Sequence, residues 1–214
     1  MLLDFEKTKE LLGKYQIPMV ESLVIKTAQE GIEFAGRVGF PVVLKLVSND
    51  VLHKIDKGLV KLNIQNEQQL QDSFSKFNGG QTPASLRGSV FPQILIQKQI
   101  SGTEIFLGMK RDKSFGPAIS FGLGGIFVEV LEDIVFGICP IEKKEALEMI
   151  KKIKGYKILQ GYRGQPKVDI EKLADVLVNI SNLSFENKYI QEIDFNPVIA
   201  SGSDIFIVDP KVIL

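Results

Sequence analysis

The chain contains a single histidine, His53, whose side chain can carry out more than one kind of chemistry. It follows the apolar run of residues 42–47 and lies in a segment rich in turn-forming and charged residues. One histidine cannot build a multi-histidine metal site, but it can carry a proton or attack as a covalent nucleophile. Its neighbours Asp50 and Asp56 indicate only a polar segment, so a solvated surface histidine is the alternative interpretation.

A second group of chemically capable residues lies near the end of the chain. If Gly202-Ser203 forms a two-residue hairpin turn, the strand register places Asn196 opposite Asp209. Directly opposed residues have Cβ atoms about 5 Å apart on one face of a sheet, and Asp194 and Lys211 share that face. Amide and carboxylate oxygens suit Mg²⁺ bridged to a nucleotide phosphate. The alternative is a set of solvated polar residues on an edge hairpin.

Three glycines, among them Gly124 and Gly125, interrupt the apolar residues of segment 121–126. Glycine permits left-handed backbone and close approach of a ligand, and successive amides can form an anion-binding nest. The segment has neither the spacing of a P-loop nor the third glycine of the dinucleotide fingerprint. A plain tight turn is therefore an equally compatible interpretation.

Several isolated charges lie where they could contact phosphate. Lys45 interrupts a strand-like run of branched apolar residues, and an unpaired ammonium is costly to bury there. It either reaches solvent from a sheet edge or contacts nucleotide phosphates. Arg111 and Arg163 lie in glycine-bordered loops, and arginine matches phosphate oxygens bidentately, although most loop arginines are solvated. Glu104 begins a strand, where an exposed carboxylate is the simpler explanation.

The bulk composition restricts the class of protein. The chain has 214 residues, 44% of them apolar, which suits one domain or one domain split into two lobes. Its 26 basic and 26 acidic side chains create no global field that would recruit nucleic acid or an anionic membrane. The only cysteine, Cys139, cannot form an internal disulfide and fits a reducing compartment. With no apolar run near the ~20 residues of a membrane span and no signal-peptide pattern, we expect a cytoplasmic protein.

Helices and strands alternate along the chain, which predicts an α+β fold of two lobes with a nucleotide cleft between them. The polar, breaker-rich residues 78–89 form the best internal boundary. We expect a smaller lobe over 16–93, which contains His53, and a larger lobe over 94–214 that packs with a helix over 1–15. Further helices are expected at about 28–38, 66–77, 142–153 and 169–183, and strands at 42–47, 59–64, 94–97, 104–110, 117–121, 127–131, 134–141, 191–200 and 204–213.

Taken together, these segments resemble the beta subunit of ADP-forming acyl-CoA (acetyl-CoA) synthetase. The resemblance is collinear and covers essentially the whole chain, and the initial methionine suggests a separate subunit rather than a piece of a fused chain. The residues that carry it are 41–48 with Leu52-His53-Lys54, 108–112, Phe115-Gly116-Pro117, 121–129, 153–156, Gly161-Tyr162-Arg163-Gly164 and Ile193-Asp194-Phe195-Asn196-Pro197.

The resemblance implies a single ATP-grasp module over residues 1–214 and the reaction acyl-CoA + ADP + phosphate = carboxylate + CoA + ATP. It implies a CoA-binding alpha subunit as partner, a phosphohistidine on that subunit, and His53 as a second phosphate carrier. Mg²⁺ and ATP or ADP are the expected cofactor and nucleotide, with Asn196 and Asp209 as metal ligands. We expect nucleotide contacts from Lys45, Gln97, Lys98, Glu104, Arg111, Gly124, Gly125 and Arg163.

The sequence departs from the family pattern near the histidine and in the predicted hinge. Leu59 replaces a glycine and Ile55 replaces a serine, and a leucine would obstruct the loop if the glycine were needed for positive φ or for the approach of phosphate. Lys98 stands where the family usually has glutamate. Two alternatives follow: another ATP-grasp ligase that uses no phosphohistidine, and a catalytically impaired nucleotide-binding or regulatory module.

Overall fold

The computed structural model describes residues 1–47, 59–78, 93–125, 128, 130, 132–162, 164 and 166–214. These residues form two compact units, one made of Met1–Met19 with Ser101–Leu214 and the other of Val20–Ile100. His53 and Arg163 lie outside the described residues. Both sheets are antiparallel and carry helices, so the predicted α+β class is confirmed.

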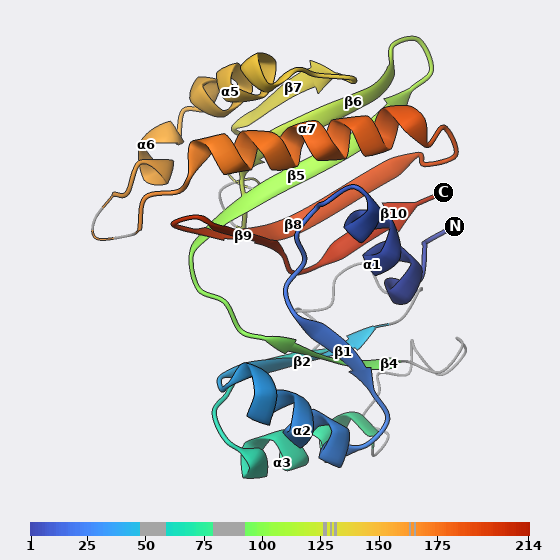
Figure 1. Ribbon diagram of the computed structural model, residues 1–214, viewed down its shortest axis with the longest axis vertical. Helices are drawn as coiled ribbons and strands as arrows, with labels where there is room; N and C mark the ends of the chain where they lie inside the picture. The colour runs from blue at the N-terminus through green and yellow to red at the C-terminus, as the bar shows by residue number, and fades with distance from the viewer. Residues whose placement is uncertain are drawn as a thin grey trace. The chain divides into compact units, whose positions relative to one another are not determined.

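The unit formed by Val20–Ile100 is a four-stranded sheet in the order β1-β4-β2-β3, with two helices on one face (Figure 1). The first helix begins where its capping residue predicts, because Thr27 Oγ1 accepts the backbone N–H of Glu30 at 3.2 Å. Apolar residues from the helices and from alternate strand positions form one core. The elements are β1 (Ser22–Ile25), α2 (Ala28–Val38), β2 (Val42–Val47), β3 (Val60–Ile64), α3 (Glu67–Asn78) and β4 (Gln93–Lys98).

The boundaries of the two units differ from those of the predicted lobes, which were 16–93 and 94–214. Strand β4 pairs with both β1 and β2, and its Ile94 and Ile96 belong to the core of the Val20–Ile100 unit. Residues 94–100 therefore belong with the smaller unit, because two strand ladders and a shared core hold them there. The sequence placed the boundary too early, since the breaker-rich segment precedes β4 instead of following it.

The other unit is a larger sheet in the order β10-β8-β5-β6-β7, with β9 also paired to β8. Helices α5, α6 and α7 lie on one face of this sheet (Figure 1), and the main apolar core lies beneath them. Its elements are α1 (Phe5–Lys14), β5 (Thr103–Asp112), β6 (Gly116–Leu123), β7 (Ile134–Ile138), α5 (Lys143–Lys152), α6 (Tyr156–Leu159), α7 (Ile170–Glu186), β8 (Glu192–Ser201), β9 (Asp204–Ile207) and β10 (Pro210–Ile213).

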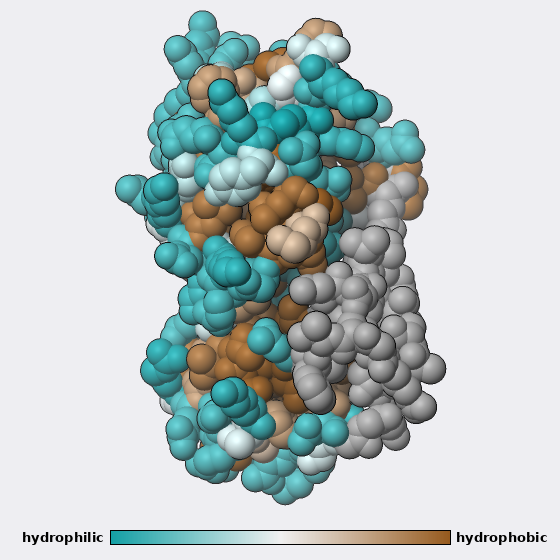
Figure 2. All heavy atoms as spheres, turned by 90° about the vertical axis from the view of Figure 1, so that its right-hand side faces the viewer, coloured by the Kyte–Doolittle hydropathy of each residue, from teal (hydrophilic) through white to brown (hydrophobic). Residues whose placement is uncertain are grey.

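Two local expectations need correction. Val128 and Val130 are helical, so the strand predicted over 127–131 is wrong at these positions. The short helix α6 was not predicted because four residues are too few to show a helical period. Figure 2 shows apolar side chains reaching the surface in patches among mostly hydrophilic ones. Within the described ranges, no helix has the length and apolar character needed to cross a bilayer.

Candidate functional site

The C-terminal hairpin has the predicted turn and register. Ser201 pairs with Asp204 across the two turn residues, and the ladder continues to the pair of Val198 with Ile207. Strand pairing is interrupted after Ile207 and resumes in the same register in β10, where Pro210 pairs with Phe195. The interruption falls at Asn196 and Asp209, which the flanking pairs place opposite each other. The hairpin thus supplies an amide oxygen and a carboxylate at one level of the sheet.

The alternation of core-facing and outward-facing side chains along β8 is broken next to Asn196. Phe195 and Val198 both lie in the main core although they are three residues apart, and the register of β8 with β5 shifts at this level. The intervening Asn196 therefore lies away from the helix-covered core. Asp194, on the same side, is paired with the directly opposed Lys211 by a Nζ to Oδ2 contact of 3.1 Å. The Asp194 carboxylate is thus engaged by Lys211, two pairs along the hairpin from the predicted ligands Asn196 and Asp209.

The glycine-rich segment lies against this hairpin. Gly124 donates its N–H to the carbonyl of Glu104 at 2.8 Å, and Gly125 N lies 3.4 Å from Asn196 Oδ1. Gly125 has a φ of +59°, and a Cβ added there would overlap the Glu104 carboxylate. Both properties require glycine. Glu104, Gly125 and Asn196 are therefore brought together, as the phosphate and metal prediction needs.

Replacing Gly125 with alanine should weaken nucleotide binding, because the new methyl group displaces the carboxylate of Glu104. The matched control is Gly116→Ala, since Gly116 also has positive φ (+79°) but a Cβ added there would meet no other atom within 4 Å. The control should lose about 1–2 kcal/mol of unfolding free energy and keep its nucleotide affinity. Calorimetric titration with Mg·ADP and urea denaturation measure the two effects, and equal affinities in both variants would contradict the role of Gly125.

Arg111 does not join this group. Its Nε donates to the carbonyl of Ile190 at 2.9 Å, and its Nη2 donates to the carbonyls of Ser184 at 2.7 Å and Asn187 at 3.1 Å. It lies seven residues along β5 from Glu104, about 23 Å away in an extended strand. Arg111 thus satisfies carbonyl groups around the C-terminal end of α7, and this structural role replaces the predicted phosphate contact.

Replacing Arg111 with methionine should destabilise the fold and leave nucleotide affinity unchanged. The substitution keeps much of the aliphatic stem but removes the guanidinium donor of three carbonyls, of which only that of Asn187 also accepts a backbone N–H, from Ile190, in the described hydrogen bonds. We expect a loss of about 2–3 kcal/mol in the free energy of unfolding by urea. Lys110→Met is the control, because Lys110 is an exposed neighbour on the same strand. A fall in Mg·ADP affinity in Arg111→Met alone would restore the original prediction.

In the Val20–Ile100 unit, Lys45 and Gln97 share one face of the sheet. The core residues of β2 and β4 alternate with them, so both side chains lie on the side away from α2 and α3. Lys45 pairs with Leu95, which makes Gln97 a diagonal neighbour about 7–8 Å away. Lys45 is 8% exposed on a strand with partners on both sides, so it does not reach solvent from a sheet edge. Lys98 follows Gln97 and lies on the opposite face, which removes its side chain from this set.

Leu59 does not occupy the place of a strained glycine. Its side chain is 2% exposed and belongs to the core of the Val20–Ile100 unit, and its carbonyl accepts the N–H of Leu46 at 2.9 Å. It is absent from the described residues that have positive φ. The leucine is therefore accommodated by burial on the helix side of the sheet, and the expected obstruction by positive φ does not arise. Ile55 lies outside the described residues.

The sequence did not identify Asp133 as a residue of interest. Its carboxylate is buried and accepts the backbone N–H groups of Lys154 and Gly155 at 2.9 and 2.8 Å. Its carbonyl lies so close to Gly122 that a Cβ there would be 2.7 Å from it. The Asp133 carboxylate therefore holds the turn before α6, and its carbonyl packs against β6, the strand that leads into the glycine-rich segment. The only signal in the sequence is the acidic pair Glu132-Asp133 between apolar residues.

The donor set fits one metal ion of the magnesium type. Among the described residues, no group of three or more His, Cys, Asp and Glu side chains is arranged to hold a metal. Mg²⁺ does not need such a cage, because it is commonly bound by one or two carboxylates together with substrate phosphates and waters. Asn196 and Asp209, with the Glu104 carboxylate beside Gly125, provide that kind of incomplete oxygen set.

Comparison with known proteins assigns the family. A model of the ATP-grasp domain matches residues 1–214. The beta subunit of acetate–CoA ligase (ADP-forming) I from Pyrococcus furiosus is 42% identical over 208 residues, 97% of this chain and 90% of that subunit. Acetyl-coenzyme A synthetase 1 of Candidatus Korarchaeum cryptofilum, solved with coenzyme A and Ca-AMPCP, has a TM-score of 0.88 and 38% identity and covers 100% of this chain and 93% of its own.

A second structure of that synthetase contains coenzyme A and Mg-AMPPCP, with a phosphohistidine segment pointing towards the nucleotide binding site. It has a TM-score of 0.84 and 37% identity, over 100% of this chain and 92% of the other. The chain belongs to the ATP-grasp family and, within it, to the beta subunits of ADP-forming acid–CoA ligases. The predicted family, fold and enzyme class are confirmed.

Proposed function

We propose that this chain binds ADP or ATP with Mg²⁺ and moves a phosphoryl group between the nucleotide and a phosphohistidine of a CoA-binding alpha subunit. The overall reaction is acyl-CoA + ADP + phosphate = carboxylate + CoA + ATP. The observation that carries this proposal is the convergence of Glu104, Gly125, Asn196 and Asp209 on one hairpin and its neighbouring segment. The similarity to a synthetase solved with Mg-AMPPCP supports the same chemistry.

Asn196 and Asp209 would hold the metal ion, with Glu104 beside them. Bound Mg²⁺ neutralises phosphate charge and orients the phosphates for in-line transfer. The N–H groups of Gly124 and Gly125 are donated to the Glu104 carbonyl and to Asn196 Oδ1, so the glycine-rich segment helps to hold these two residues in place. The protein's contribution here is to fix the carboxylate and amide positions before the nucleotide arrives.

Lys45 and Gln97 of the Val20–Ile100 unit are also proposed as nucleotide contacts. Lys45 brings an ammonium to a buried position on the face that it shares with Gln97, where low solvent access strengthens its attraction for phosphate. Gln97 is 2% exposed, and its Nε2 has no hydrogen-bond partner among the described residues. A buried donor without an acceptor is costly, so a ligand acceptor such as a nucleobase nitrogen explains it. Lys45 and Gln97 are retained in the site on these grounds.

His53 would act as the intermediate phosphate carrier. Its ring nitrogen attacks the phosphorus of the partner's phosphohistidine, forming one N–P bond as the other breaks. The phosphoryl group then passes to a terminal oxygen of ADP, which yields ATP and restores neutral His53. Arg163 is retained as a proposed phosphate contact on the strength of the family motif alone.

Reconstitution tests this function. The chain is mixed with a CoA-binding alpha subunit of the same family, acetyl-CoA, ADP, phosphate and Mg²⁺, and ATP is measured by luciferase. We expect ATP only when both subunits are present. Turnover by this chain alone with a carboxylate and a thiol or amine would indicate a different ATP-grasp ligase. Nucleotide binding without phosphoryl transfer with any alpha subunit would indicate a binding module.

We also propose a cytoplasmic location. Cys139 is buried and free, so this chain has no internal disulfide to maintain. Such cysteine usage is typical of reducing compartments.

A further inference from the structure

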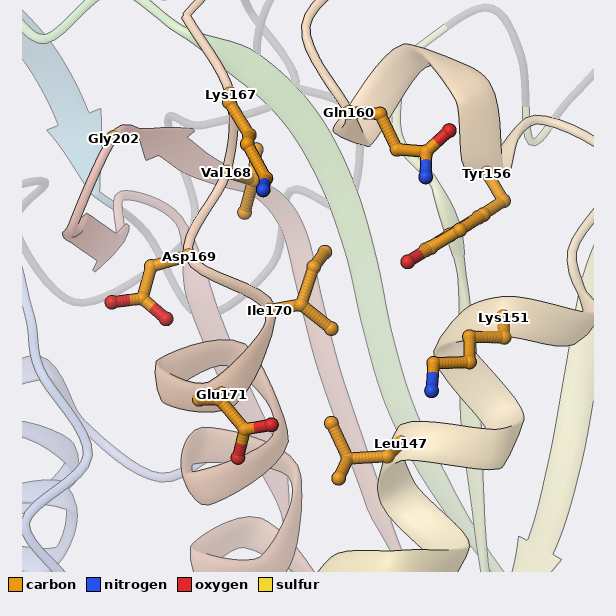
Figure 3. A pocket seen from close by; sticks show the side chains of 10 residues that line it. All are labelled: Leu147, Lys151, Tyr156, Gln160, Lys167, Val168, Asp169, Ile170, Glu171 and Gly202. Atoms are coloured by element: carbon orange, nitrogen blue, oxygen red, sulfur yellow. The ribbon is translucent and has the colours of Figure 1, made fainter.

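An open surface pocket of about 510 Å³, called the cavity below, lies on the helix-covered side of the larger sheet, outside the proposed nucleotide site. Its walls come from the end of α5, from α6, from the residues that lead into α7, and from the β8–β9 turn (Figure 3). This volume is within the range of roughly 300–1,000 Å³ typical of small-molecule sites. The lining residues are Leu147, Lys151, Tyr156, Gln160, Lys167, Val168, Asp169, Ile170, Glu171 and Gly202.

The two acidic residues in the wall already have partners. Asp169 caps α7, because its Oδ1 accepts the backbone N–H of Lys172 at 3.1 Å. Glu171 forms an ion pair with Lys143 at 3.2 Å. Neither carboxylate therefore needs a cation inside the cavity. Both carboxylates thus have partners that do not line the cavity, although the partner of Asp169 is a neutral N–H and Lys143 is shared with Asp175 at 2.8 Å.

The cationic and neutral polar side chains of the wall, in contrast, have no such partners among the described residues. Lys151 and Lys167 make no ion pair or side-chain hydrogen bond with any residue that the structure describes. The same holds for the hydroxyl of Tyr156 and the amide of Gln160. Figure 3 shows the Tyr156 hydroxyl and the Lys151 ammonium directed into the space between α5, α6 and the start of α7. The hydrogen-bond donors of the cavity wall are thus available to a ligand, whereas its two carboxylates already have partners in the protein.

The remaining wall is apolar. Leu147, Val168 and Ile170 line the cavity between the charged groups, and the ring of Tyr156 adds a flat surface. A hydrated inorganic ion would leave this part of the cavity without a complementary group. A ligand with an anionic end and an apolar, planar body would contact both parts.

We propose that this cavity binds a small organic anion, a phosphate or carboxylate attached to an apolar ring, with Lys151 and Lys167 as the charge-bearing contacts. The site is separate from the proposed nucleotide site, so its existence does not depend on the phosphoryl-transfer function. No metal or cofactor is needed for the interaction. Because the ligand would contact α5, α6 and the start of α7, binding should hold these three elements together.

Calorimetric titration of the full chain with phenyl phosphate, benzoate and inorganic phosphate tests the proposal. The titrations are run with and without saturating Mg·ADP, because phenyl phosphate could also enter the nucleotide site. We expect phenyl phosphate or benzoate to bind in the presence of Mg·ADP, and more tightly than inorganic phosphate. Preference for phenyl phosphate identifies an organic phosphate as the ligand class, and preference for benzoate identifies a carboxylate.

Variants separate the cavity from general surface charge. Lys151→Met and Lys167→Met should each weaken the preferred probe about tenfold, the usual effect of losing one charge-assisted contact. Lys152→Met is the matched control, since Lys152 is the exposed neighbour of Lys151 on α5 and does not line the cavity. The proposal is overturned by failure of both organic probes to bind, by their displacement with Mg·ADP, or by an equal loss in Lys152→Met.

Discussion

Replacing Asp209 with alanine is expected to lower Mg²⁺-dependent ATP formation by at least about 100-fold. Replacing even residues that only support a metal ligand typically costs 10–100-fold in metal affinity, and we propose Asp209 as a direct ligand. The flanking pairs of the hairpin put this carboxylate opposite Asn196, and Asp194 on the same face is paired with Lys211. The measurement is the Mg²⁺ dependence of turnover by the reconstituted enzyme, together with the affinity for Mg·ADP.

The control for this substitution lies in the same hairpin. Asp204→Ala removes an exposed carboxylate next to the turn, at the pair with Ser201, and should leave both quantities unchanged. If raising the Mg²⁺ concentration restores Asp209→Ala to full turnover, the residue contributes affinity alone. Unaltered Mg·ADP affinity in Asp209→Ala would remove it from the metal site.

Replacing His53 with alanine is expected to abolish phosphorylation of this chain and to reduce turnover on the order of 10⁴-fold or more, as losses of covalent nucleophiles do. Labelled phosphate, an alpha subunit and acetyl-CoA should place an acid-labile label on the wild-type chain. Because the chain has one histidine, a phosphohistidine label on it has only one possible location. Mass spectrometry of the intact subunit measures the label directly.

The result distinguishes two routes of transfer. Loss of both label and turnover supports His53 as an obligatory carrier. Turnover that survives His53→Ala would mean that the phosphohistidine of the alpha subunit reaches ADP directly, and the carrier role would be wrong. Mg·ADP affinity should be unaffected by the substitution, which guards against a folding defect as the cause.

Local signals were sufficient for much of the fold and for part of the site. The pair Gly202-Ser203 determines a turn type and hence a register, and that register is the reason Asn196 and Asp209 could be matched from the sequence. The cap at Thr27 likewise locates the start of α2 because a side-chain oxygen and a backbone N–H three residues later are enough to form it. In both cases the determining atoms lie close together in the chain.

Two of the wrong predictions, for Arg111 and for strand β4, concern residues whose partners are distant in sequence. Arg111 resembles a phosphate ligand in its own loop, but its acceptors are carbonyls more than seventy residues away. Strand β4 was assigned to the wrong lobe because only its pairing with β1 and β2 shows where it belongs. Lys98 was grouped with Gln97 although adjacent residues of a strand point to opposite faces, a rule that the sequence itself could have supplied.

The two-residue turn of the C-terminal hairpin limits how this chain can vary in length. Surface turns usually tolerate insertions and deletions. Here one additional residue would shift each cross-strand pair by one position and reverse which side chains face the core, including Ile205 and Ile207. Asp209 would lose its place opposite Asn196, which lies six residues, or about 20 Å, from the turn. A surface turn that takes no part in the proposed metal site is therefore subject to the same constraint on length as that site itself.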